Sequence, residues 1–230
     1  MIVEDEASIR LGLTDLLTYH GYRVDAVGDG EQGLRQALTG RFDLILLDLM
    51  LPGIGGFEVC EAIRKRDRSQ PIIILTAKTG DEDIIAGLSL GADDYVAKPF
   101  SVAQLVLRIK AVLRRAAIGI EAETEIELGN GTTIDTRNLS GRRGDVCLVF
   151  TRREIEILRY LAASAGTCVS RDELLNKVWG YHRHAAIETR TVDIHIAKLR
   201  RKIEPDPQTP RFLVTVRGAG YRLVPETASA

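Results

Sequence analysis

Five polar side chains in the first half of the chain lie at the ends of short apolar runs. Glu4 and Asp5 follow the first run, and Asp48, Thr76 and Lys98 come at the ends of three later ones. Because ligands bind beyond the carboxyl ends of the strands in an open parallel sheet, we expect these side chains to converge on one crevice. Three carboxylates in one place repel one another unless a cation lies among them. Oxygen ligands without His or Cys favour Mg²⁺ over zinc.

This set of residues is suited to phosphoryl chemistry. Mg²⁺ and the Lys98 ammonium would neutralise phosphoryl oxygens, the Thr76 hydroxyl would donate a hydrogen bond, and Asp48 could act as the nucleophile. Any one of these residues taken alone is more often a solvated loop residue, so the prediction depends on their coincidence at successive strand ends. A haloacid-type phosphatase would need a second Asp two residues after the first, and Met50 stands there.

The elements that would position these residues alternate between strands and helices over residues 1–115. Apolar runs predict strands at 2–3, 23–27, 43–47, 71–75 and 95–97, and apolar residues at helical spacing predict helices at about 9–20, 31–38, 57–66, 82–90 and 102–115. The central runs LILL and IIIL are apolar at every position, as is typical of strands buried on both sides. The pattern predicts an α/β fold with a doubly wound five-stranded parallel sheet.

The second half has a different pattern. Residues 116–124 predict a linker, and 125–227 predict a separate domain. Asn130-Gly131 indicates a hairpin, Thr151 and Ser170 begin helices with capping boxes, and a third helix is expected over about 188–203. The glycine-rich turn 217–220 joins two final strands. Three helices and a terminal hairpin predict an α+β winged helix-turn-helix domain.

Composition narrows the class of protein. Of 230 residues, 27% are charged, and no apolar run approaches the ~20 residues of a membrane helix, so we expect no membrane partner. The charged amino terminus and three cysteines without C-x-x-C spacing favour the reducing cytoplasm. Residues 128–230 carry 17 basic and 11 acidic groups, whereas 1–115 carry 14 and 17. The basic excess indicates an anionic partner for the second domain.

The third helix of that domain has two distinct faces. Its apolar face is expected to pack in the core and consists of Val192, Ile196, Leu199 and Ile203. The opposite face carries Arg190, Ile194, Lys198 and Arg201. A charged face is usually only solvated surface. However, the third helix of a helix-turn-helix enters the DNA major groove, and Ile194 within a basic face suits contact with a thymine methyl.

Four motifs in the first domain resemble the receiver domain of two-component response regulators: VEDE (3–6), LILLDLMLPG (44–53), ILTAK (74–78) and GADDYVAKPF (91–100). The second domain resembles the effector domain of the OmpR/PhoB class through FTRREIEILRYL (150–161), VSRDELLNKVWG (169–180), TRTVDIHIAKLRRKI (189–203) and TVRGAGYRL (215–223). The resemblance implies a flavodoxin-like (CheY-like) receiver with strand order 2-1-3-4-5. It also implies phosphoryl transfer from a sensor histidine kinase to Asp48, and a transcription regulator rather than an enzyme.

By the same resemblance, Asp5, Asp48 and the Met50 carbonyl bind Mg²⁺ directly, and Glu4 acts on the ion through water. The phosphoryl-binding and switch residues are Thr76, Ala77, Tyr95 and Lys98, and the Lys98–Pro99 bond is expected to be cis. The family usually has several more residues before the position of Glu4. Either the start is misassigned, which we expect, or the first strand is short by a few residues.

Phosphorylation is expected to produce a homodimer through the fourth helix, fifth strand and fifth helix. Two charge pairs of the family have counterparts here, Asp94 with Arg108 and Asp93 with Lys110. The family's third charge pair is absent, because its two positions hold Ile84 and Gln104 in this sequence. Ile84 would then extend an apolar patch, so the dimer is expected to be less sensitive to salt. The expected patch consists of Ile84, Ile85, Leu88 and Val106.

The resemblance also implies DNA contacts on tandem half-sites, with RNA polymerase as a further partner. Residues in or beside the major groove would be Arg190, Thr191, Lys198 and Arg200. Arg217 would reach the minor groove, and Thr215 and Tyr221 would touch phosphate. Lys198→Ala is expected to cost about 1–3 kcal/mol on the cognate site.

Two other functions remain open from the sequence. One is a regulator that dimerises and binds DNA without phosphate, and a complete acidic pocket argues against it. The other is a phosphatase-like enzyme with an accessory domain. The missing second Asp and the basic helix argue against that alternative.

Overall fold

The computed structural model describes residues 1–77, 80–117, 125–164, 166–181 and 190–224. The chain divides into two compact units, Met1–Ala117 and Ile118–Ala230. The predicted linker lies largely outside the described residues, as does the end of the chain. No helix in the described ranges combines the length and apolar character needed to cross a bilayer.

The first unit contains a five-stranded parallel sheet with the order β2-β1-β3-β4-β5, which confirms the predicted topology. The strands are β1 (Ile2–Val3), β2 (Ala26–Val27), β3 (Ile45–Leu47), β4 (Ile72–Thr76) and β5 (Asp94–Ala97). The helices are α1 (Ala7–Tyr19), α2 (Gly30–Ala37), α3 (Gly56–Arg66), α4 (Asp81–Ser89) and α5 (Val102–Ala117). All five predicted strands and helices are present, with boundaries shifted by up to three residues.

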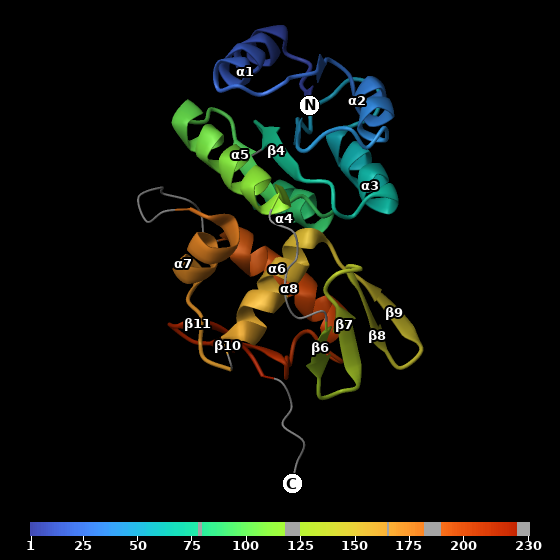
Figure 1. Cartoon of the computed structure of the whole chain (residues 1–230), viewed down its shortest axis with the longest axis vertical. Coiled ribbons are helices and arrows are strands. Elements are labelled where there is room, and N and C mark those ends of the chain that lie inside the picture. Colours follow the sequence, from blue (N-terminus) through green and yellow to red (C-terminus); the bar gives the residue numbers. More distant parts are fainter. Residues whose placement is uncertain (78–79, 118–124, 165, 182–189, 225–230) are drawn as a thin grey trace. The chain divides into compact units, whose positions relative to one another are not determined.

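Both faces of this sheet are covered by helices, because alternate strand residues point to opposite sides. On one face, Ile73 and Leu75 of β4 pack with residues of α1 and α5 such as Leu13 and Ile109. Figure 1 shows α5 on one side of β4, and α2 and α3 on the other. Residues 72–75 are at most 1% exposed. Burial on both sides explains why the central strands are apolar at every position.

A glycine allows close packing beside the end of β3. A Cβ on Gly56, the first residue of α3, would lie 2.0 Å from the carbonyl oxygen of Asp48. Only glycine leaves room for that approach. The start of α3 is therefore held directly against the residue that follows β3.

The second unit begins with a four-stranded antiparallel sheet in the order β6-β7-β8-β9. Its strands are β6 (Glu125–Leu128), β7 (Thr132–Asp135), β8 (Ser140–Arg143) and β9 (Val146–Val149). Strand β8 was not predicted from the sequence. Its residues, SGRR, carry no apolar side chain, so no alternation marks the strand.

Three helical segments and a hairpin complete this unit. They are α6 (Arg152–Ala163), α7 (Arg171–Leu174) continuing as the π-helix η1 (Leu175–Trp179), α8 (Arg190–Ile203), and the antiparallel pair β10 (Leu213–Val216) and β11 (Gly220–Leu223). Helix α6 begins with the predicted capping box, in which the Thr151 amide donates to the Glu154 carboxylate over 2.7 Å. Helix α7 begins with the Ser170 hydroxyl accepting from the Glu173 amide. The arrangement is a winged helix-turn-helix, as predicted.

Candidate phosphorylation pocket and nucleic-acid interface

Three carboxylates meet beyond the carboxyl ends of β1 and β3. Each of Glu4, Asp5 and Asp48 offers an oxygen, and these oxygens all lie within 4.8 Å of one another. Glu4 and Asp48 are buried, with 1% and 3% exposure, whereas Asp5 is exposed. The three residues are close because adjacent parallel strands end at the same edge of the sheet. The pocket thus has an enclosed floor and an open rim.

The Lys98 ammonium bridges two of these carboxylates. It donates to both Glu4 oxygens over 2.8 and 2.6 Å and to Asp48 Oδ2 over 2.6 Å. Burial raises the pKa of Glu4 above its ordinary value, and the hydrogen bond from Lys98 opposes that rise. Burial alone would lower the pKa of Lys98, but its bonds to Asp48 and Glu4 raise it. Lys98 is therefore a fixed cation at the floor of the pocket.

Among the other predicted pocket residues, Met50 contacts Asp48 directly. The Met50 amide donates to Asp48 Oδ1 over 3.1 Å, and this bond orients the carboxylate. Thr76 ends β4 and is fully buried, while Ala77 is exposed. Tyr95 is 7% exposed, with its ring beside Gly87 of α4. Burial raises the pKa of Tyr95 well above its ordinary value, so the phenol stays neutral.

One residue at this site was missed. Arg10 of α1 donates from Nη1 to the carbonyl oxygens of Glu4 and Asp5, over 2.6 and 2.9 Å. It fixes the backbone that carries two of the acids. No sequence motif predicts that Arg10, six residues after Glu4, belongs to this site. Only the path of α1 past the loop reveals its role.

This donor set fits a divalent cation such as Mg²⁺. All three acids offer hard oxygen ligands, and neither His nor Cys belongs to the cluster. The exposed Asp5 leaves the rim accessible, while the Lys98 ammonium already balances part of the buried negative charge. The cis Lys98–Pro99 bond is present, as predicted.

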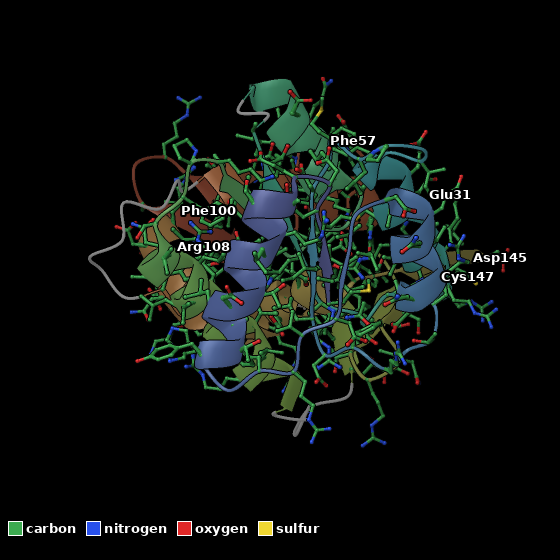
Figure 2. The ribbon with its side chains drawn as sticks, turned by 90° about the horizontal axis from the view of Figure 1, so that it is seen from above. Glu31, Phe57, Phe100, Arg108, Asp145 and Cys147 are labelled. Carbon is green, nitrogen blue, oxygen red and sulfur yellow. The ribbon has the colours of Figure 1, made fainter. Side chains whose placement is uncertain are left out.

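The surface of α4, β5 and α5 differs from the expected dimer face. Arg108 of α5 (labelled in Figure 2) forms an ion pair with Asp94 over 2.6 Å within one chain. Asp93 was expected to pair with Lys110 of a second copy, but it is 5% exposed and bonded to Arg64 over 3.0 Å. Its carboxylate also accepts from the Ile72 amide. The Asp93 carboxylate is thus enclosed between α3 and β4 within one chain, and its pairing with Lys110 across a dimer stays a prediction.

The expected apolar patch also changes. Leu88 is fully buried, and Ile84 and Val106 are only 8% and 5% exposed, so these three pack inside the receiver. Ile85 is 46% exposed, and the exposed apolar residues of α5 are Val102 and Leu107. Gln104 and Lys110 are exposed, as an interface would require. A helical register gives the side of a helix on which a residue lies and not the depth of its neighbours, and the contact of these residues with a second copy stays a prediction.

In the second unit, the apolar face of α8 is buried as predicted. Val192, Ile196, Leu199 and Ile203 are each at most 1% exposed. Ile194 is partly exposed and Arg201 exposed on the other side. Thr191 is 6% exposed, and its carbonyl accepts from His195. The side chain of Arg190 lies outside the described residues.

Lys198 does not occupy the groove-facing position that the projection gave it. Its side chain is 13% exposed and its ammonium lies 3.5 Å from the Glu154 carboxylate of α6. The projection placed Lys198 toward solvent because it took no account of α6. Glu154 is fully buried. The sequence contains one signal for Glu154, because this residue is the Glu of the capping-box motif that predicts the start of α6.

The wing carries a second internal network. Arg200 of α8 donates to the Leu213 carbonyl and to the Thr215 hydroxyl, each over 2.7 Å. The Tyr221 hydroxyl donates to Asp193 of α8 over 2.5 Å and accepts from Arg171 over 3.0 Å. These bonds join the hairpin to α8. Arg217, at the wing turn, is exposed.

Comparisons with known proteins agree with both halves of this description. Residues 1–110 match the model of the response regulator receiver domain, and residues 145–223 match that of the transcriptional regulatory protein C-terminal domain. The chain is 41% identical over 226 residues to the sensory transduction protein RegX3 of Mycolicibacterium smegmatis, covering 97% of each. It is 42% identical to the response regulator ArlR of Staphylococcus aureus, covering 96% of this chain and 97% of the relative. The chain is a response regulator of the OmpR/PhoB class.

Solved structures of this class also align over nearly the full length. A mutant of RitR aligns with a TM-score of 0.71 at 31% identity, covering 97% of each chain. DrrB of Thermotoga maritima, an OmpR/PhoB homologue, aligns with a TM-score of 0.51 at 32% identity and covers 96% of each.

Members of this class are transcription regulators that bind DNA, not enzymes, so that prediction is confirmed. Their receiver domains accept a phosphoryl group from histidine kinases and bind Mg²⁺ at an acidic pocket. This chain has an acidic cluster of Glu4, Asp5 and Asp48 that could hold a metal ion.

Proposed function

We propose that this response regulator accepts a phosphoryl group on Asp48 from a sensor histidine kinase and then binds DNA as a homodimer. The observation that carries the proposal is the Lys98 ammonium, which lies 2.6 Å from Asp48 Oδ2 inside a buried acidic pocket. A cation fixed beside a carboxylate nucleophile stabilises the charge that develops on transferred phosphoryl oxygens. The proposed units are a receiver at 1–115, a linker at 116–124 and an effector domain at 125–227.

The transfer balances as a simple displacement. An oxygen of Asp48 forms a bond to phosphorus, the phosphorus–nitrogen bond of the donor phosphohistidine breaks, and the electron pair leaves with the imidazole. Asp48 is positioned by the Met50 amide and Lys98, which hold its two oxygens separately. When bound through Glu4, Asp5, Asp48 and the Met50 carbonyl, Mg²⁺ would supply charge neutralisation to the phosphoryl oxygens. Thr76 and the small, exposed Ala77 would line the side from which the phosphoryl group enters, and Tyr95 would respond behind Thr76.

A direct test uses acetyl phosphate with Mg²⁺, followed by intact-mass measurement. The parent chain is expected to gain one phosphoryl group, and Asp48→Asn is expected to gain none. Asp43→Asn is the matched control, because Asp43 is an exposed Asp just before β3. Equal phosphorylation of the parent and Asp48→Asn would refute the assignment of the nucleophile.

For dimerisation, we propose the face formed by α4, β5 and α5, with Ile85, Val102 and Leu107 as its exposed apolar contacts. Asp94 and Arg108 are already paired within the chain, and Gln104 and Lys110 contribute polar surface. Phosphorylation adds roughly −1.5 to −2 charges at Asp48, and α4 and β5 would carry that change to the interface. Because Asp94 and Arg108 are paired within the chain and the exposed contacts Ile85, Val102 and Leu107 are apolar, the dimer is expected to be less sensitive to salt than those of relatives.

For DNA recognition, we propose that α8 enters the major groove with Ile194 and Arg201, together with Arg190 and Thr191 near its start. Arg217 would reach the minor groove from the wing. Arg200, Thr215 and Tyr221 would hold the hairpin against α8 and thereby orient both reading elements. A dimer would occupy tandem half-sites in the cytoplasm, where RNA polymerase is the expected partner.

Binding to duplex DNA tests this part. Arg201→Ala and Arg217→Ala are each expected to reduce the salt dependence of log K by about 0.9 if each side chain contacts one phosphate. Arg222→Ala is a control, since Arg222 is exposed on β11 and has no proposed contact. If the parent, Arg201→Ala, Arg217→Ala and Arg222→Ala all show the same slope, neither α8 nor the wing contacts DNA phosphate. The proposed mode of DNA binding is then refuted.

A further inference from the structure

The loop between β1 and α1 carries two of the clustered acids, Glu4 and Asp5, and its backbone is held from two sides. The Glu4 amide donates to the Val27 carbonyl at the end of β2 over 3.1 Å. From the other side, Arg10 Nη1 donates to the carbonyl oxygens of Glu4 and Asp5, over 2.6 and 2.9 Å. One nitrogen thus bonds two consecutive carbonyl groups, and these bonds fix the course of the chain through both acids.

The position of Arg10 depends on its helix and on a glycine. Arg10 lies one turn into α1, and its amide donates to the Glu6 carbonyl over 2.9 Å. A Cβ on Gly28, which follows β2, would lie 3.1 Å from Arg10 Nη1. That is closer than nonbonded atoms ordinarily approach, so the lack of a side chain at Gly28 leaves the guanidinium its space.

The contact has two opposite effects on a cation at the acidic cluster. The positive charge of Arg10, bonded to the loop, repels a divalent cation, although water at the exposed Asp5 screens this repulsion. Against this, the fixed backbone holds the Glu4 and Asp5 side chains in place, which avoids the cost of ordering the loop when the ion binds. Both bonds of Arg10 end on carbonyl oxygens, so the carboxylate oxygens of the two acids stay available to other partners. The two effects predict changes of opposite sign in metal affinity when Arg10 is replaced.

We propose that Arg10 is a positioning residue of the Mg²⁺ site, and that its ordering of the loop outweighs its repulsion of the ion. The inference rests on the proposed binding of Mg²⁺ by the acidic cluster. It goes beyond that proposal because Arg10 offers no oxygen to the ion and acts only through the backbone of Glu4 and Asp5. Outer partners that orient metal ligands typically contribute about 10–100-fold to metal affinity.

The test is a Mg²⁺ titration of the full-length chain, followed through its backbone amide NMR signals. Arg10→Met removes the donor and the charge but keeps a long side chain. Its Kd for Mg²⁺ is expected to rise about tenfold or more, whereas loss of a merely repulsive charge would lower the Kd. Arg68→Met is the control, because Arg68 is exposed in the segment before β4, at the opposite edge of the sheet, and should leave the Kd unchanged.

A second variant displaces the guanidinium without removing its charge. Gly28→Val adds a side chain where a Cβ would already lie 3.1 Å from Arg10 Nη1, and we expect it to weaken Mg²⁺ binding as Arg10→Met does. Gly12→Val, at an exposed position of α1, adds the same side chain where no atom lies within 4 Å and should leave the Kd unchanged. A variant that had merely lost part of its fold would show a second set of amide signals, and the titration midpoint of its folded set would equal that of the parent.

The inference is supported if both variants bind Mg²⁺ more weakly while both controls bind it as the parent does. It is overturned if Arg10→Met tightens Mg²⁺ binding or leaves the Kd unchanged, because Arg10 then acts as a repulsive charge or not at all. It is also overturned if Gly28→Val binds Mg²⁺ like the parent, since moving the guanidinium then has no consequence. If the parent itself shows no Mg²⁺-dependent change in its amide signals, the proposed metal site fails and the role of Arg10 falls with it.

Discussion

His195 should make the effector domain unstable in mild acid. Its ring is 1% exposed, Nδ1 donates to the Thr191 carbonyl over 2.8 Å, and the ring lies edge-on to Trp179 at 5.2 Å between centroids. Burial lowers the pKa of His195 from 6.5 to about 4, and the neighbouring Lys198 and Arg153 act in the same direction. The folded chain therefore keeps this imidazole neutral where an unfolded chain would protonate it.

The sign and size of the effect follow from proton linkage. Above pH 6.5 both states are neutral, and the full stability is present. As pH falls from 6.5 to about 4, the unfolded state binds a proton that the folded state excludes, so stability is lost. This difference in the pKa of His195 between the unfolded and folded states corresponds to about 3 kcal/mol in the free energy of unfolding. That is roughly one third of the stability of a typical domain.

The assay is urea unfolding across this pH window, followed by tryptophan fluorescence. The chain has one tryptophan, Trp179, and it is buried in the effector domain, so the signal reports that domain within the full chain. His195→Gln keeps an amide donor for the Thr191 carbonyl and does not titrate. It is expected to be less stable than the parent near neutral pH but to lose much less stability on acidification.

His20→Gln, at an exposed position in the receiver, is the control and should behave like the parent. If the parent and His195→Gln lose equal stability between pH 6.5 and about 4, the buried neutral imidazole is not the cause, and the reasoning is refuted.

Three further predictions concern the packing and assembly of each unit. Gly220→Ala should cost more than about 2 kcal/mol in Trp179-monitored unfolding, because Gly220 has φ +148° and a Cβ would lie 2.0 Å from the Val169 carbonyl oxygen. Gly218→Ala, at φ +74° with no atom within 4 Å, should cost only about 1 kcal/mol, and equal losses would contradict the steric argument. Arg64→Met should destabilise the receiver by about 3–5 kcal/mol in circular-dichroism unfolding, since it leaves Asp93 buried without its cation, while Lys110→Met should have little effect. Equal losses for the two variants would contradict a stabilising buried pair of Arg64 with Asp93. Leu107→Glu should abolish the phosphorylation-dependent dimer in sedimentation velocity, whereas Leu38→Glu, also at an exposed leucine, should not. If both variants still form dimers, the surface of α5 around Leu107 is not the dimer interface.

Short-range sequence patterns were sufficient to predict most elements of the fold. Runs such as IIIL could only be strands buried on both sides, and the alternation of strands with helices required a parallel sheet with acids at one edge. The apolar register of α8 placed Val192, Ile196, Leu199 and Ile203 in the core, as the structure has them. These features depend on the period of a strand or helix, which neighbouring residues set by themselves. The polar strand β8 shows the limit, because a strand without apolar residues has no such period.

Only the tertiary structure decided which partner each long charged side chain takes. Lys198 turns to Glu154, Asp93 to Arg64, and Tyr221 to Asp193 and Arg171, although helical projection or motif alone had directed these residues outward. Leu88 lies in the core although its register placed it on an interface. The physical reason is that an ion pair or a buried contact depends on the distance between elements far apart in the chain. Local periodicity fixes the direction of a side chain, and the packing of the whole domain fixes what it meets there.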